Sequence, residues 1–352
     1  MIVYSLRAKS NLMLKFRHSE PSALPVTASV THDQLGALCF SAAAVEQQTA
    51  SSFEIPCAHI QMKPLDGVNT VWQNVYSLQD PSSVKSGQCG DVHFRHDDDI
   101  LFGVVTLDEV QFAGDSGTPL QNASRHAYEQ LFSAMQDTGF PYLLRCWNYL
   151  ADINGISDGL ERYRQFNLGR QQAFDSQSLL IDHAPPAACA LGIQHDPRHS
   201  LTLAFLATRT APIAVDNPRQ VKPRDYPPEY GPRSPLFSRA CIARRGDNTQ
   251  LFLSGTASIA GHQTLHDDDV IAQTEETLLN IRTVLAAANA HCARPIALDD
   301  LEYTVYIRHA MHLLPIRDAL EQRIGKNLKA AYLQADICRA DLLLEIEGFV
   351  NR

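Results

Sequence analysis

Apolar residues in the middle of the chain alternate between a strand pattern and a helix pattern. Residues 99–109 (DILFGVVTLDE) form an apolar run typical of a buried strand, and residues 124–135 place Tyr128, Leu131 and Met135 at helical spacing. The alternation predicts a first set of six elements. These are a strand at 99–109, a helix at 124–135, a strand at 142–150, a helix at 160–174, and strands at 186–193 and 200–208.

The same order of elements returns in the C-terminal half of the chain. Ile271, Leu278 and Leu285 share one face of a long predicted helix, and Phe252 occupies the position that Phe102 has in the first set. The chain therefore contains an internal repeat. The second set is a strand at 249–259, a helix at 271–288, a strand at 301–308, a helix at 315–325, and strands at 330–337 and 341–350.

The order β-α-β-α-β-β in each set predicts an α+β fold of two tandem units, because the strands are too few and too irregularly spaced for a doubly wound parallel sheet. Each unit would leave an apolar sheet face uncovered, so we expect the units to pack against each other. Runs at 35–43 and 68–78 predict further strands. The predicted regions are an N-terminal β-rich extension (1–95), a first unit (96–210), a connector rich in Arg and Pro (211–240) and a second unit (241–352).

The last predicted strand has an unusual second face. Leu344, Ile346 and Val350 form one apolar face, whereas Glu345 and Glu347 lie on the other face beside a leucine and a phenylalanine. An apolar setting raises a carboxyl pKa and keeps the group protonated as a general acid, whereas an adjacent arginine would lower that pKa. This carboxylate pair is the strongest acid/base candidate in the sequence.

Composition narrows the class of protein. The chain has 352 residues, 45% of them hydrophobic, and a net charge of −9, which argues against nucleic acid or an anionic membrane as a partner. No apolar stretch approaches the roughly 18 residues of a membrane span, and the N-terminus lacks the apolar core of a signal peptide. None of the eight cysteines forms a C-x-x-C pair. We therefore expect a cytoplasmic protein with reduced thiols.

The connector concentrates arginine in this acidic chain. Residues 217–245 hold several arginines together with Tyr226 and Tyr230, and prolines stiffen the segment. Because the planar fork of Arg matches a carboxylate, one interpretation is an ordered loop that binds a small anion with more than one carboxylate. The other interpretation is a solvated linker whose arginines pair with Asp225 and Glu229.

The predicted helix at 160–174 carries Arg162, Arg164 and Arg170, and the matching helix of the second unit carries Arg317. At helical spacing some of these side chains must face solvent. For a helix considered by itself, the pattern favours a solvated basic face.

Several motifs point away from metal and phosphate chemistry. Residues 254–262 (SGTASIAGH) place small side chains at a strand end, which suits close approach of the backbone to a ligand. There is no phosphate-binding glycine motif, nucleophile elbow or H-E-x-x-H motif. HDDD occurs at 96–99 and 266–269, but three consecutive acids cannot all converge on one ion. Asp267–Asp269 instead favour the start of a helix, and we expect no metal site.

Three fragments of the second unit resemble the YjgF/RidA superfamily. They match its G-P-x-S start, its S-G strand end with a Q-T-x-x-x-L-x-N-I helix, and its terminal V-E-I-E strand. Superfamily members are trimers with ligand clefts between subunits, and a duplicated chain would build such a cleft internally. The fragments are residues 230–240 (YGPRSPLFSRA), 251–281 (LFLSGTASIAGH to QTEETLLNI) and 337–349 (ICRADLLLEIEGF).

The connector, with RYRQFNLGR (162–170) and ADICRADLLLEIEG (335–348) around it, resembles the chorismatases over essentially the whole chain. This resemblance implies two tandem YjgF/RidA-like (chorismate-mutase-like) units with a pseudo-trimer-like cleft, the second unit being catalytic. It implies cleavage of chorismate to release pyruvate, without cofactor, after Glu345 protonates the enolpyruvyl methylene. The substrate-binding and pocket residues that it implies are Tyr163, Arg170, Arg219, Tyr226, Arg317 and Ala257.

Chorismatase subtypes differ in their second product, and Cys338 places this chain with the hydroxybenzoate formers. By residue type alone Cys338 is a small buried hydrophobe, and no histidine base is near it in sequence to make it a nucleophile. We expect 3-hydroxybenzoate, with 4-hydroxybenzoate as a second product, from a monomer or weak oligomer. The alternatives are a hydrolase that forms the trans-dihydroxycyclohexadiene carboxylate, and a YjgF-like imine hydrolase or metabolite-binding protein.

Overall fold

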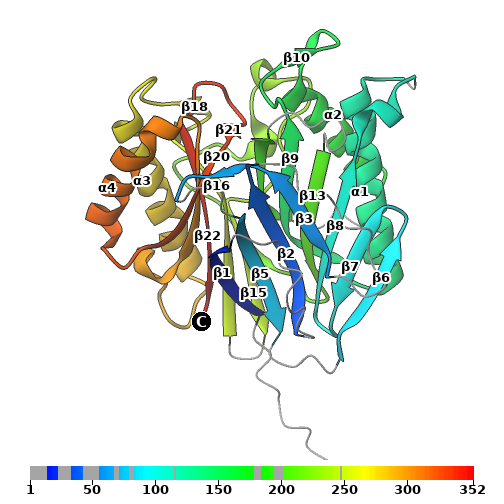
Figure 1. Ribbon diagram of the computed structural model, residues 1–352, viewed down its shortest axis with the longest axis horizontal. Coiled ribbons are helices and arrows are strands. Elements are labelled where there is room, and N and C mark those ends of the chain that lie inside the picture. The colour runs from blue at the N-terminus through cyan, green and yellow to red at the C-terminus, as the bar shows by residue number, and fades with distance from the viewer. Residues whose placement is uncertain are drawn as a thin grey trace, which may run out of the picture.

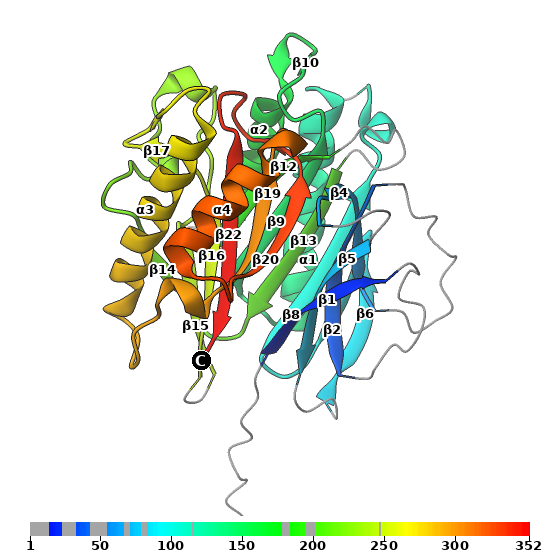
Figure 2. The same cartoon turned by 60° about the vertical axis from the view of Figure 1, so that its left-hand side comes forward.

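A computed structural model describes residues 14–22, 33–42, 55–66, 71–78, 83–114, 116–177, 184–193, 201–245 and 248–352. Two seven-stranded sheets and one four-stranded sheet surround a shared core. In Figure 1 helices α3 and α4 lie at the left and α1 and α2 at the right, with the strands between them. Figure 2 shows α3 and α4 across the outer face of their own sheet.

The first unit builds the sheet β21-β12-β9-β13-β8-β7-β6, covered by helices α1 (Pro119–Thr138) and α2 (Arg162–Asp175). Helix α1 begins where the Thr118 hydroxyl accepts a hydrogen bond from the Gln121 N–H, and it ends where Gly139 adopts a left-handed φ of 74°. The strands are β6 (Lys85–Cys89), β7 (Val92–His96), β8 (Ile100–Leu107), β9 (Tyr142–Ala151), β12 (Ala187–Ile193), β13 (Leu201–Thr208) and β21 (Asp336–Ile337).

The second unit builds the sheet β14-β15-β16-β22-β19-β20-β4, covered by α3 (Val270–Asn289) and α4 (Leu313–Ile324). Asp269 begins α3 by accepting hydrogen bonds from the Ile271 and Ala272 N–H groups, as the acidic turn predicts. The strands are β4 (Lys63–Pro64), β14 (Ile213–Val215), β15 (Ala240–Arg245), β16 (Asn248–Thr256), β19 (Glu302–Ile307), β20 (Lys329–Gln334) and β22 (Leu344–Asn351).

The two sheets have the same topology, which confirms the predicted repeat and the α+β class. The order β12-β9-β13-β8 of the first unit returns as β20-β19-β22-β16, and the β9/β12 and β19/β20 pairs are parallel while their neighbours are antiparallel. Each outer edge is extended by a strand from elsewhere in the chain. Strand β21 of the second unit pairs with β12, and β4 of the N-terminal region pairs with β20.

The N-terminal region forms a third sheet, β1-β5-β2-β3, built from β1 (Leu14–Ser22), β2 (Gln34–Ser41), β3 (Cys57–Gln61) and β5 (Val71–Leu78). The predicted strands at 35–43 and 68–78 correspond to β2 and β5, although residues 43 and 68–70 lie outside the described residues. Strands β6 and β7 belong to the first sheet, so that sheet begins before the predicted limit at residue 96.

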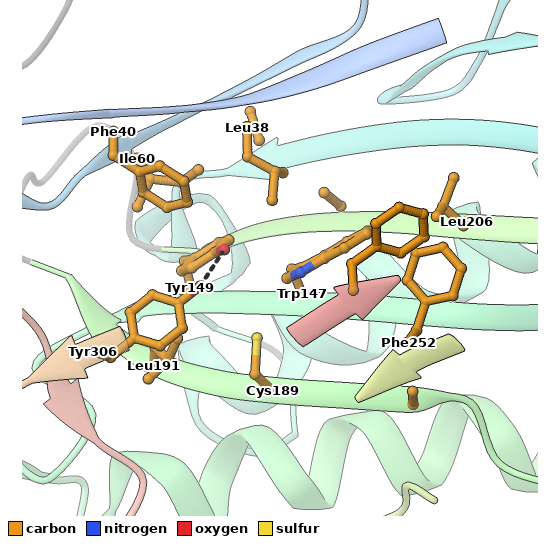
Figure 3. Close-up of a cluster of buried hydrophobic side chains, with 14 of the residues drawn as sticks. Leu38, Phe40, Ile60, Trp147, Tyr149, Cys189, Leu191, Leu206, Phe252 and Tyr306 are labelled. Atoms are coloured by element: carbon orange, nitrogen blue, oxygen red, sulfur yellow. Dashed lines mark hydrogen bonds between the residues drawn. The ribbon is translucent and has the colours of Figure 1, made fainter. Parts of the chain in front are cut away.

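A single apolar core joins all three sheets. Leu38 and Phe40 come from the N-terminal sheet, Trp147 from the first unit, and Phe252 and Tyr306 from the second. Figure 3 shows these side chains pointing toward one another. One separate apolar cluster fills the space between the first large sheet and its helices, and another fills the space between the second large sheet and its helices. The units therefore pack against each other as expected, and the N-terminal sheet covers a further part of the first unit's inner sheet face.

Candidate active site

A cavity of about 410 Å³ opens where the two units meet. The first unit contributes α2 and β12, and the second unit contributes the end of β16 and the start of β22. The connector and the loop that follows β21 close the remaining sides. Among the residues that line the cavity are Tyr163, Arg170, Cys189, Tyr226, Tyr230, Arg239, Gly255, Ala257, Cys338, Arg339 and Glu345.

Glu345 lies in the wall of this cavity with 4% of its surface exposed. It is on β22 opposite Tyr306, and an added Cβ on Gly255 would lie 1.8 Å from its Oε1 atom. Burial raises the pKa of Glu345 to about 8, and the nearby Glu347 carboxylate adds to the rise, while Arg145 and Arg239 oppose it. At neutral pH Glu345 is therefore a protonated acid facing a ligand-sized space.

The second face of β22 is thus neither solvated nor purely apolar. Glu345 borders the cavity, and Glu347 is buried beside Phe349 against the shared core. Leu344 and Ile346 on the opposite face pack toward the helices of the second unit. The alternation in the sequence correctly separated these two faces.

Arginine side chains surround the acid. Arg170 is 3% exposed, donates to the Asn167 side-chain oxygen at 2.7 Å and lies over the Phe166 ring. Arg239 is buried and donates to Val221 O and to the Tyr226 hydroxyl. Buried guanidinium groups bordering a cavity favour a ligand that carries carboxylates.

Arg339 adds a further cation at the cavity. It donates to His262 O and lies over the Tyr230 ring, 4.1 Å from its centroid, with Tyr226 behind. The connector is therefore an ordered wall of the cavity, and the solvated-linker interpretation is wrong. The solvated-face interpretation of α2 is also wrong for Arg162 and Arg170, both of which are buried.

Polar side chains of α3 hold the wall in place. Gln273 donates to Asp341 O and accepts from the Leu343 N–H, which fixes the loop carrying Cys338. Asn280 donates to Ala257 O and Ile259 O, which fixes the segment of the cavity wall that follows β16. These are the Gln and the Asn of the Q-T-x-x-x-L-x-N-I motif, and each hydrogen-bonds to backbone groups of the cavity wall.

Six of the eight residues singled out from sequence line the cavity. They are Tyr163, Arg170, Tyr226, Ala257, Cys338 and Glu345. Arg219 does not line it, because its guanidinium donates to Glu276 and Asn280 at 2.7 Å each. Arg219 thus lies behind the wall that Asn280 supports.

Arg317 is also absent from the cavity. It pairs with Asp66, which follows edge strand β4, and lies over the Tyr332 ring at the edge of the second sheet. Strand β4 has the same relation to β20 that β21 has to β12. Arg317 therefore occupies the second unit's counterpart of the cavity edge, where a carboxylate of the chain itself neutralises it.

Further residues that line the cavity include Arg164, Cys189, Tyr230, Phe237, Arg239, Gly255 and Arg339. Arg164 and Tyr230 stand out in the sequence as members of basic or aromatic segments, but none of these residues was expected as a site residue. Arg239 and Tyr230 belong to the connector, whose composition gave a signal without a way to rank its members. Cys189 gave none, since an apolar strand such as β12 is typical of any core.

Cys338 is a neutral thiol in the cavity wall. Burial raises its pKa to about 12, with Glu345 as the next cause. A thiol held in this state is a poor nucleophile. All eight cysteines are free thiols in the structure.

Among the described residues, Cys39, Cys57 and His59 of the N-terminal sheet are close enough together to be considered as metal ligands. The two sulfur atoms are 2.6 Å apart, closer than the roughly 3.7 Å that separates two thiolates on one tetrahedral zinc. The group does not line the cavity. In the described part of the chain no helix is long and apolar enough to cross a membrane.

A buried acid in an arginine-bordered cleft between two tandem α+β units is typical of an enzyme active site. A family profile described as Chorismatase FkbO/Hyg5-like, N-terminal, matches residues 75–207. A chorismatase of Streptomyces rapamycinicus is 37% identical over 275 residues, 76% of this chain and 79% of the relative. A 3-hydroxybenzoate synthase of Streptomyces hygroscopicus is 36% identical over 240 residues, 65% of this chain and 69% of the relative.

A crystal structure of a chorismatase superposes with a TM-score of 0.81 at 31% identity, covering 96% of this chain and 98% of that chain. This chain belongs to the chorismatase family.

Proposed function

We propose that this enzyme cleaves the enolpyruvyl ether of chorismate and releases pyruvate and 3-hydroxybenzoate, with 4-hydroxybenzoate as a second product. The observation that carries the proposal is the protonated, buried Glu345 in a cavity bordered by Arg170, Arg239 and Arg339. Chorismate carries two carboxylates, which these guanidinium groups would neutralise. An enol ether is activated by protonation, which Glu345 would supply.

In the proposed first step, Glu345 gives its proton to the enolpyruvyl methylene and a C–H bond forms. The ether oxygen shares the positive charge of the resulting oxocarbenium ion, and the Glu345 carboxylate left behind stabilises it. The neighbouring ring hydroxyl of chorismate then adds to the cation and gives its proton to the Glu345 carboxylate, which forms a cyclic ketal. A ring proton is lost as one ring C–O bond breaks, which makes the ring aromatic, and the released oxygen takes up that proton. The resulting hemiketal collapses to pyruvate and hydroxybenzoate. Pyruvate and hydroxybenzoate together have the composition of chorismate, so this outcome consumes no net water.

The test is to incubate the purified protein with chorismate, to follow pyruvate by a coupled dehydrogenase assay and to separate the aromatic products by chromatography. We expect pyruvate to accumulate together with 3-hydroxybenzoate, at about one pyruvate for each molecule of hydroxybenzoate formed. Absence of pyruvate would overturn the proposal. The dihydroxycyclohexadiene carboxylate as the main product would instead identify a hydrolase, and a thermal shift without turnover would identify a binding protein.

Replacing Cys338 with alanine should redirect the product. The side chain fills space beside Glu345, and its removal leaves room for a water molecule at the cation. We expect the dihydroxycyclohexadiene carboxylate to rise at the expense of 3-hydroxybenzoate, while the rate of pyruvate release changes by less than about tenfold, because no proton transfer is lost. Chromatography of the product mixture measures the ratio. Cys241→Ala, a buried thiol outside the cavity, is the control, and an equal product shift there would contradict the assignment.

A further inference from the structure

A buried ion pair lies directly behind the proposed acid and has no role in the steps above. Arg145 of β9 is 1% exposed and donates to the Glu347 carboxylate, which thus binds the first unit to the second. Tyr306 donates to the other oxygen of Glu347 at 2.9 Å. Tyr149 lies 3.4 Å from the Tyr306 hydroxyl, the contact drawn as a dashed line in Figure 3.

The position of this pair is more informative than its presence. The free-energy cost of removing two charges from water offsets most of their attraction. Apolar side chains of similar volume therefore often stabilise a core as much as an ion pair does. Glu347 is two residues from Glu345 on the same face of β22, and Tyr306 pairs with Glu345 in the ladder. The charges therefore lie where they act on the acid.

We propose that Glu347, ion-paired with Arg145 and hydrogen-bonded by Tyr306, keeps Glu345 in its neutral, proton-donating form, which makes Glu347 and Arg145 positioning residues for the reaction. The inference rests on the proposed role of Glu345 as the proton donor. After the proton is transferred, repulsion from Glu347 also favours return of a proton to Glu345, which restores the acid for the next turnover.

The remaining groups around Glu345 do not supply this effect. Arg239, next to β15, is a cation and favours the charged form of the acid. Cys189 of β12, Cys338 after β21 and Tyr163 of α2 also interact with Glu345, but burial raises each of their pKa values, so all three are neutral at pH 7. Besides burial, Glu347 is thus the group that favours the protonated acid.

Glu347 and Arg145 should shift the high-pH side of the activity profile in opposite directions. Activity requires protonated Glu345, so wild-type activity should fall as pH rises through about 8. In Glu347→Gln the repulsion disappears while Arg145 remains, and the fall should move about 1–3 pH units lower. In Arg145→Gln two carboxylates share the site without a counterion, and the fall should move higher. Arg145→Gln/Glu347→Gln removes both charges, and its fall should lie below the wild-type position and above that of Glu347→Gln, because Glu347 acts on Glu345 more strongly than Arg145 does.

The experiment records kcat/KM for chorismate against pH in the wild type and these three variants. Opposite shifts in the two single variants support the proposal. Equal loss of activity at every pH would overturn it in favour of a structural role. Each single variant has its own expected direction of shift, so one folded single variant is enough to test the proposal. A Glu345→Gln enzyme with wild-type activity would show instead that the proposed proton donor is wrong.

Discussion

In Glu345→Gln, kcat for pyruvate release from chorismate should fall by about 10²–10⁴-fold, the usual contribution of a general acid. Glutamine has the same shape and cannot donate the proton that the enol ether needs. Because burial keeps Glu345 neutral near pH 7, the substitution leaves the buried charge unchanged. The thermal unfolding midpoint should therefore stay close to that of the wild type, and the loss should be chemical. Steady-state pyruvate assays and a melting curve on the same preparation measure both.

Glu302→Gln is the matched control for this change. Glu302 is on the neighbouring strand β19 and interacts with Lys329 at the sheet edge, outside the cavity. Its substitution should leave kcat within a factor of about two, as expected for a side chain that contacts no substrate. A near-wild-type rate in Glu345→Gln would place the proton donor elsewhere in the cavity.

Much of the architecture could be predicted from the sequence because its periodicities are local. The six-element pattern of each unit needs only the spacing of apolar residues, and both copies fold into the predicted order of strands and helices. The two faces of β22 follow from simple alternation. The edges of the two large sheets could not be assembled in this way, since the pairings of β21 with β12 and of β4 with β20 join segments far apart in the sequence.

The site shows a different limit, which concerns electrostatic partners. Arg219 and Arg239 lie in the connector that suggested anion binding, and the family resemblance implied Arg317 as a substrate-binding residue, yet Arg239 alone of these three borders the cavity. The other two meet Glu276 and Asp66, carboxylates of the chain itself. Which cation remains available to a ligand depends on contacts across the fold, and no local pattern encodes them.

Arg317 and Asp66 show how the corresponding edges of the two units differ in their contacts. The edge of β12 receives β21, and the loop after it brings Cys338 and Arg339 to an open space. At the corresponding edge of β20, β4 is followed by Asp66, which pairs with Arg317. At this edge the cation is paired with a carboxylate of the chain itself, so the repeat is symmetric in its backbone and asymmetric in its chemistry.

Gly255→Ala should lower kcat by about 10²-fold, the scale of a catalytic group displaced by about an ångström. An added Cβ would lie 1.8 Å from Glu345 Oε1 and 3.1 Å from Cys189 Cβ, and the carboxyl group is the part that can move. The fold should survive, because the contact falls on the end of a side chain. Gly103→Ala on β8 is the control, since its Cβ would press on the buried Phe205 ring at 2.4 Å, far from any reacting atom. That variant should melt at a lower temperature and keep its kcat per folded molecule. Wild-type turnover in Gly255→Ala would show that the carboxyl position beside β16 is not the one that donates the proton.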